Sequence, residues 1–260
     1  MELPTVDVVS FNRKAWDREV RDGNPWTCPV RPEEVDAARR GDWSILLTPT
    51  KPVPRPWFGT ILGANVLCLA SGGGQQGPIL AAAGAHVTVL DNSPAQLGQD
   101  RHVATRDSLT IRLELGQMED LSRFSDSMFD LIVHPVSNLF TPNVRRVWQE
   151  AFRVLRRGGS LLAGFANPAM YLFDAKEVEK GAFLVRHALP YSDIASLPRE
   201  ELDELLERHE ALEFSHSLED QIGGQIEAGF FVNGFYEDRW PGHPIDRYFP
   251  TFMATRASKP

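Results

Sequence analysis

The chain has 260 residues, of which 42% are hydrophobic and 24% are charged, and this composition is typical of a globular protein built around one main domain. The formal net charge is −8 and no block of Lys and Arg stands out, which argues against a nucleic acid or an anionic membrane as partner. No apolar run reaches the roughly 18 residues of a membrane-spanning helix, and the N-terminus lacks the apolar core of a signal peptide, so we expect a cytoplasmic protein.

Residues 1 to about 60 differ from the rest because they are rich in Pro and Trp and show little periodicity. Four of the six Trp residues lie here, namely Trp16, Trp26, Trp43 and Trp57. The stretch FNRKAWDREV predicts a short helix, and the prolines that follow interrupt regular structure. We expect an N-terminal extension that adds no strand to the main domain. Its aromatic side chains either anchor it by burial or cover a ligand pocket.

Strands and helices alternate from Asn65 onward. The apolar run NVLCLA predicts a strand buried on both faces, and QQGPILAAAG predicts a helix that ends at Gly84. HVTVLD predicts a second strand, after which Ser93, Pro94 and Gln96 form a capping box that starts another helix. LTIRLEL, FDLIVH and SLLAGF predict three more strands. This alternation predicts a doubly wound, mostly parallel α/β sheet.

The alternation breaks after Phe165. Residues from about 165 to 200 are irregular and rich in aromatic side chains, which indicates an inserted cap. REELDELLERHEAL predicts a helix, and a capping pair of Ser217 and Asp220 predicts another that ends at Gly229. FFVNGFYED and YFPTFMATRA then predict two closing strands.

A glycine-rich turn joins the first strand to its helix. Gly72, Gly74 and Gly77 match the spacing of a nucleotide-cofactor fingerprint, in which backbone N–H groups at a helix N-terminus face an anion. Asp91 ends the second strand, where a carboxylate can accept hydrogen bonds from both hydroxyls of a ribose. NAD, FAD and other ribose-bearing cofactors all fit this pattern, and Asp91 could instead be a turn residue.

Five segments of the chain resemble the class I methyltransferases that depend on S-adenosylmethionine (SAM), in particular small-molecule enzymes with a methyltransferase 11-like domain. The segments are VLCLASGGGQQG, VTVLD, LGQMEDL, FDLIVHPVSNLF and WQEAFRVLRRGGSLLAGFANP. The resemblance implies a Rossmann-like sheet of seven strands in the order 3-2-1-4-5-7-6, with SAM as cofactor and a small molecule as methyl acceptor. It divides the chain into an extension (1–60) and a SAM-binding domain (61–260) that carries the cap.

Two alternatives remain open at this point. One is an oxidoreductase that uses the glycine-rich turn to bind NAD or FAD, and the other is a SAM-binding module without turnover. The sequence does not indicate an oligomeric state or name the acceptor. The histidines are scattered without the spacing of a metal site, so we expect no metal.

The resemblance also implies which residues bind the cofactor. They are Ala70, Ser71, Gly72, Gly73, Gly74 and Gln75 of the turn, Asp91, Asn92 and Gln96 beside the ribose, Gln117, Met118 and Glu119 beside the adenine, and His134, Pro135, Ser137 and Asn138 after the fourth strand. Two positions depart from the family pattern, because Gln117 and Ser71 stand where related enzymes carry acids.

Methyl transfer from SAM starts from an activated methyl group, so the protein chiefly has to align the reactants and exclude water. A base is needed only where the attacking atom keeps its proton at neutral pH. His134, at the carboxyl end of the fourth strand, is the candidate base or substrate-binding residue, although it could equally be a histidine bonded to backbone. Trp16 and Tyr171 are candidate acceptor-binding residues from the extension and the cap.

Overall fold

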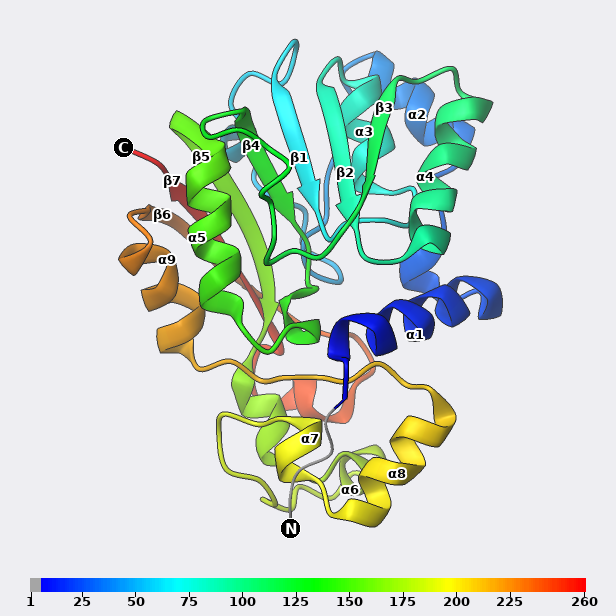
Figure 1. Cartoon of the computed structure of the whole chain (residues 1–260), viewed down its shortest axis with the longest axis vertical. Helices are drawn as coiled ribbons and strands as arrows, with labels where there is room; N and C mark the ends of the chain where they lie inside the picture. Colours follow the sequence, from blue (N-terminus) through cyan, green and yellow to red (C-terminus); the bar gives the residue numbers. More distant parts are fainter. Residues whose placement is uncertain (1–5) are drawn as a thin grey trace.

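The computed structural model describes residues 6–260 (Figure 1), so the first five residues of the expected extension lie outside the description. Seven strands form one sheet in the order β3-β2-β1-β4-β5-β7-β6, which confirms the expected fold. The pairs from β3 to β5 are parallel, and β7 lies antiparallel between β5 and β6. The strands are β1 (Asn65–Leu69), β2 (His86–Asp91), β3 (Ile111–Leu115), β4 (Phe129–His134), β5 (Leu155–Ala166), β6 (Phe231–Asp238) and β7 (Phe252–Ser258).

Helices cover both faces of the sheet and extend beyond one of its edges. In Figure 1 the parallel strands point toward α1, and a lobe that holds α6, α7 and α8 lies beyond it. The helices are α1 (Val8–Asp22), α2 (Pro32–Arg39), α3 (Gln76–Ala82), α4 (Pro94–Arg106), α5 (Val144–Val154), α6 (Ala175–Glu179), α7 (Asp193–Ser196), α8 (Arg199–Arg208) and α9 (Gly224–Glu227). Single turns used below are η3 (Asn138–Phe140), η4 (Pro168–Leu172) and the π-type turn η5 (Glu219–Gly223).

The central strands are apolar throughout because both of their faces are buried. Val66 and Cys68 of β1 pack into a core shared with α2 and α3, whereas Leu67 and Leu69 pack into a second core built on α5. Successive side chains of a strand point to opposite faces, so this alternation follows from the strand geometry. The continuous apolar run that predicts a parallel strand therefore supplies both cores.

The start of β5 differs from the expectation. The sequence predicts this strand at SLLAGF, but β5 already begins at Leu155 and runs through the preceding residues RRGG, with an irregular register beside β4. Gly158 has a φ of +77°, and a Cβ at Gly159 would lie 2.8 Å from the carbonyl oxygen of Asp130. The two glycines thus allow a bulged strand where other residues would force a turn.

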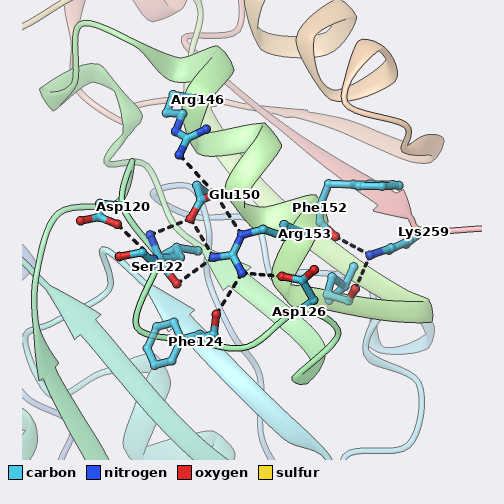
Figure 2. A network of polar contacts seen from close by, with 11 residues as sticks. Asp120, Ser122, Phe124, Asp126, Arg146, Glu150, Phe152, Arg153 and Lys259 are labelled. Atoms are coloured by element: carbon cyan, nitrogen blue, oxygen red, sulfur yellow. Dashed lines mark hydrogen bonds and ion pairs between the residues drawn. The ribbon is translucent and has the colours of Figure 1, made fainter.

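A network of charges attaches the loop between β3 and β4 to α5 (Figure 2). Glu150 is almost fully buried, and its Oε2 accepts hydrogen bonds from the Leu121 N–H and from Arg153, both at 2.9 Å. Arg153 in turn donates to the carbonyl of Phe124 at 2.9 Å and pairs with Asp126 at 2.7 Å. The hydrogen bond from Arg153 is the main reason why the pKa of Glu150 lies below its usual range. The network holds the loop whose first residues line the cavity described below.

The extension adds no strand to the sheet in its described part. Its first helix, α1, packs at the edge toward which the parallel strands point, whereas its later part, including Phe58, is buried in the core on one face of the sheet. Asp17 of α1 accepts hydrogen bonds from the Ser93 hydroxyl at 2.6 Å and from the Ala95 N–H at 3.1 Å, at the start of α4. Further along, the Val30 N–H donates to the carbonyl of Gly74 at 2.9 Å. The extension therefore crosses the carboxyl ends of the strands and also supports the glycine-rich turn.

Candidate functional site

A cavity of about 1500 Å³ lies at the carboxyl ends of the parallel strands, the edge at which open α/β sheets bind ligands. One side of it is formed by the loops after β1, β2, β3 and β4. The opposite side is formed by α1 and by the lobe of α6, α7 and α8, which Figure 1 shows beyond the strand ends. The cavity is therefore continuous from the glycine-rich turn to the lobe.

Two carboxylates hold the glycine-rich turn in place. Asp91 accepts the Gly72 N–H at 2.8 Å through one oxygen and the Ser93 N–H at 2.9 Å through the other. Asp100, buried on α4, accepts the Gly73 N–H at 3.1 Å. Burial raises the pKa of Asp91 to about 6 and that of Asp100 to about 8, against the opposing effect of these backbone hydrogen bonds.

Close approach explains why the turn contains glycine. A Cβ at Gly72 would lie 2.6 Å from the Cβ of Gln96 and 2.9 Å from Oδ2 of Asp91, a separation that real side chains do not show. Gly73 and Gly74 have φ values of +108° and +72°, which other residues rarely adopt. The turn thus brings its backbone against Asp91 and Gln96 and leaves the cavity side open.

The cavity wall fits a nucleoside. Asp91 presents a carboxylate at the end of β2, and the Gly116 N–H donates to the Asp91 carbonyl at 2.9 Å, which aligns the next segment beside it. Gln117 and Met118 follow on the wall and offer an amide and an apolar surface. Oε1 of Gln96 is buried and has no hydrogen-bond partner among the described residues, so it can accept a donor from a ligand.

Twelve of the sixteen expected cofactor-binding residues line the cavity. They are Ala70, Ser71, Gly72, Gln75, Asp91, Asn92, Gln96, Gln117, Met118, Glu119, Pro135 and Ser137. The other four, Gly73, Gly74, His134 and Asn138, do not line it. Gly73 and Gly74 give the backbone of the turn its shape. The Asn138 side chain pairs with Gln221 at 2.9 Å.

His134 is not placed to act as the base, contrary to the expectation from the sequence. Its ring is completely buried beside Trp148, with the ring centroids 5.9 Å apart, and its Nδ1 donates to the Leu69 carbonyl at 2.8 Å. Burial lowers the pKa of His134 to about 4, and Nε2 has no partner among the described residues. His134 therefore links β4 to β1 as a neutral ring. The alternative role expected from the sequence, a histidine that bonds to the backbone, is the one that the structure shows.

Sequence reasoning missed two acids of the site. Asp100 follows Gln96 by four residues on α4, the spacing that puts two side chains on one helix face, so it could have been recognised. Glu213 lines the cavity, as Trp16 and Tyr171 do. The alternation of Leu212, Glu213 and Phe214 could have revealed this acid, because it places Glu213 on the opposite side of an extended segment from two apolar side chains.

The described residues carry no other obvious ligand chemistry. Among residues 6–260 no group of His, Cys, Asp and Glu side chains is arranged to hold a metal ion, and no helix is long and apolar enough to cross a membrane. The cysteines Cys28 and Cys68 are free thiols.

Comparisons with known proteins identify the family of this chain. Residues 67–163 match the family model described as a methyltransferase domain. Over 97% of its length, the chain is 55% identical to a protein of Bacillus subtilis (strain 168) named uncharacterized methyltransferase YbaJ, 98% of which is covered. This chain belongs to the methyltransferase family. The expected methyltransferase family is thereby confirmed, and with it SAM as the cofactor.

Solved structures show the same fold at low sequence identity. The methyltransferase resembles an S-adenosylmethionine-dependent methyltransferase of Mesorhizobium loti with a TM-score of 0.60 and 18% identity, over 79% of this chain and 95% of that one. It resembles the [4+2]-cyclase SpnF with a TM-score of 0.62 and 14% identity, over 100% of this chain and 99% of that one. Because one of these neighbours is named as a cyclase, the fold by itself does not specify the reaction.

Proposed function

We propose that this methyltransferase transfers a methyl group from SAM to a small-molecule acceptor that binds between α1 and the lobe. The observation that carries the proposal is the size and continuity of the cavity. Its volume of about 1500 Å³ exceeds the range of roughly 300–1,000 Å³ that is usual for the site of one ligand. It therefore has room for a cofactor and a second small molecule in the same cavity.

The residues on the wall suggest how the cofactor is held. Asp91 accepts the ribose hydroxyls, while Gln117 and Met118 contact the adenine from the segment after β3. Ser71 and Ser137 offer hydroxyl groups to the methionyl part. When bound, SAM supplies a methyl group that is already activated, so the protein's part is to align the acceptor and to exclude water.

The extension (1–60) and the insertion after β5 form the acceptor side in this proposal. Trp16 of α1 packs edge-on against Phe140 of η3, with the ring centroids 5.1 Å apart, and lines the cavity. Tyr171 of η4 lines it from the insertion. These aromatic walls favour an acceptor with apolar or aromatic surface. The free thiols of Cys28 and Cys68 are compatible with a cytoplasmic location.

Ligand binding and turnover test the proposal separately. S-adenosylhomocysteine (SAH) is expected to raise the melting temperature, because a ligand that binds only the folded state stabilises it, whereas NAD and FAD at the same concentration are not. A shift from NAD or FAD alone would contradict the proposal.

Turnover is then measured with SAM labelled in its methyl group. The wild-type protein and the Asp91→Ala variant are incubated with separated small-molecule, protein and RNA fractions of bacterial cells. We expect label in the small-molecule fraction with the wild type only. Label in protein or RNA would assign another acceptor class, and SAH binding without label in any fraction would favour a SAM-binding module.

A further inference from the structure

An extended segment that follows α8 brings an acid to the acceptor side of the cavity. The Phe214 N–H donates to the Leu139 carbonyl at 2.8 Å, and the Leu212 N–H donates to Oδ1 of Asn12 at 2.8 Å. Leu212 and Phe214 are buried in a core shared with α1 and α8. Because successive side chains of an extended segment point to opposite sides, Glu213 faces away from that core, and it lines the cavity.

The position of this segment links it to the cofactor side. Leu139 lies in η3, two residues after Ser137, and Pro135 and Ser137 line the cavity directly after β4. Asn12 joins the same parts, since its amide donates to the carbonyls of Phe140 at 3.2 Å and Leu212 at 3.0 Å. Glu213 is thus anchored beside the carboxyl end of β4, at the boundary between the cofactor side and the lobe.

Hydrogen bonds orient Glu213 but leave one of its oxygens available. Tyr171 donates its hydroxyl to Oε2 at 2.7 Å, and the backbone N–H of Glu213 donates to Oδ2 of Asp193 at 2.6 Å. Asp193 also accepts the hydroxyl of Tyr191 at 2.6 Å, so both of its oxygens are engaged. Oε1 of Glu213 makes no hydrogen bond within residues 6–260, which leaves it as the acceptor that can face a ligand.

The surroundings of Glu213 favour proton exchange near neutral pH. Burial is the largest effect and raises the pKa of Glu213 to about 7, the hydrogen bond from Tyr171 opposes it, and the nearby charges of Asp193 and Glu210 add to it. Of the basic side chains that line the cavity, Arg186 pairs with Asp174 and Glu201, Lys176 with Glu204, and Arg208 with Glu210. The other two, His187 and His243, have pKa values below the usual range of histidine, mainly because of burial. A carboxyl with such a pKa can both take up and release a proton at pH 7.

We propose that Glu213 is the base of the reaction and that the acceptor attacks through an atom that carries a proton at neutral pH, such as a hydroxyl oxygen or an ammonium nitrogen. The proton of the attacking atom passes to Oε1 of Glu213, which leaves its bonding electron pair on that atom. This pair forms the bond to the methyl carbon, and the carbon–sulfur bond breaks with its electron pair left on sulfur. Tyr171 is a positioning residue that holds the carboxylate. This inference rests on the proposed function.

Matched variants test the inference. Glu213→Gln keeps the size of the side chain and an acceptor for Tyr171, but it cannot take up the proton. Tyr171→Phe removes the orienting hydroxyl. Glu207→Gln is the control, because Glu207 is exposed on α8 and does not line the cavity. Each variant is assayed with methyl-labelled SAM against a panel of phenols, alcohols and primary amines, and SAH affinity is measured alongside.

We expect Glu213→Gln to lower kcat/KM by about 100-fold or more, the usual contribution of a positioned base, with SAH affinity within about twofold of the wild type. The rise of kcat/KM with pH near 7 is expected to disappear in Glu213→Gln and to move to higher pH in Tyr171→Phe, while Glu207→Gln retains it. Activity of Glu213→Gln within twofold of the wild type would overturn the inference. A wild type that binds no SAH would instead contradict the proposed function.

A second measurement does not depend on the acceptor. Carbon-13 spectra of the Glu side chains are recorded against pH in the SAH-bound protein, and the signal missing from Glu213→Gln identifies this residue. We expect its carboxyl to titrate near pH 7. A midpoint below about pH 5.5 would leave Glu213 too weak a base and would overturn the inference.

Discussion

Replacing Asp91 with Asn is expected to weaken cofactor binding strongly while leaving the stability of the fold almost unchanged. Burial raises the pKa of the Asp91 carboxyl to about 6, so the charged form costs the folded state stability once the pH exceeds the ordinary pKa. A shift of about two units corresponds to roughly 3 kcal/mol at pH 7. Asn avoids this cost, but its amide has only one acceptor oxygen, so either the Gly72 or the Ser93 N–H loses its partner at a cost of roughly 1–3 kcal/mol. Because the two effects are of similar size, the ligand-free variant should melt within about 5 °C of the wild type, at about 2–4 °C per kcal/mol.

The same change removes an acceptor for the ribose. A hydrogen bond to a charged group contributes roughly 1.5–3 kcal/mol, and each 1.4 kcal/mol is tenfold in affinity, so the Kd of SAH should rise about 10- to 150-fold. Calorimetry with SAH and thermal unfolding at pH 7 measure both effects. Asp36→Asn, on the exposed surface of α2, is the control and should change neither. SAH binding within threefold of the wild type, or a melting temperature changed by more than about 10 °C, would refute the reasoning.

Three further predictions concern the same site. SAH affinity should fall about tenfold between pH 7 and pH 5, because protonation of Asp91 through its pKa of about 6 removes the ribose acceptor, and calorimetry that found a constant affinity over this range would contradict the role. Gly72→Ala should lower the melting temperature and weaken SAH binding more than tenfold, since the new Cβ would lie 2.6 Å from the Cβ of Gln96 and such overpacking costs roughly 1–3 kcal/mol. Trp16→Ala should slow methyl transfer more than tenfold in the labelled-SAM assay and leave SAH affinity within threefold, whereas a loss of SAH binding alone would place Trp16 on the cofactor side.

Local patterns in the sequence determined where the main strands and helices of this protein lie. The apolar run of β1 predicted a strand buried on both faces, and the box of Ser93 and Gln96 predicted the start of α4, where the Gln96 N–H does donate to the Ser93 hydroxyl at 3.1 Å. The resemblance supplied the strand order and the cofactor. The strand and the helix start depend on residues that are near one another in the chain, so the periodicity and spacing of side chains reveal them.

The tertiary structure alone decided which side chains reach the cavity. His134 and Asn138 are close in the chain to residues that line the cavity. The His134 ring is nevertheless buried and bonded to the Leu69 carbonyl, and the Asn138 amide pairs with Gln221. Glu213 enters the cavity because Asn12 and Leu139, far from it in the chain, hold its segment. Burial, pKa and orientation arise from contacts between distant segments. The local alternation around Glu213 could therefore show that the acid points away from its apolar neighbours, but not that it enters the cavity.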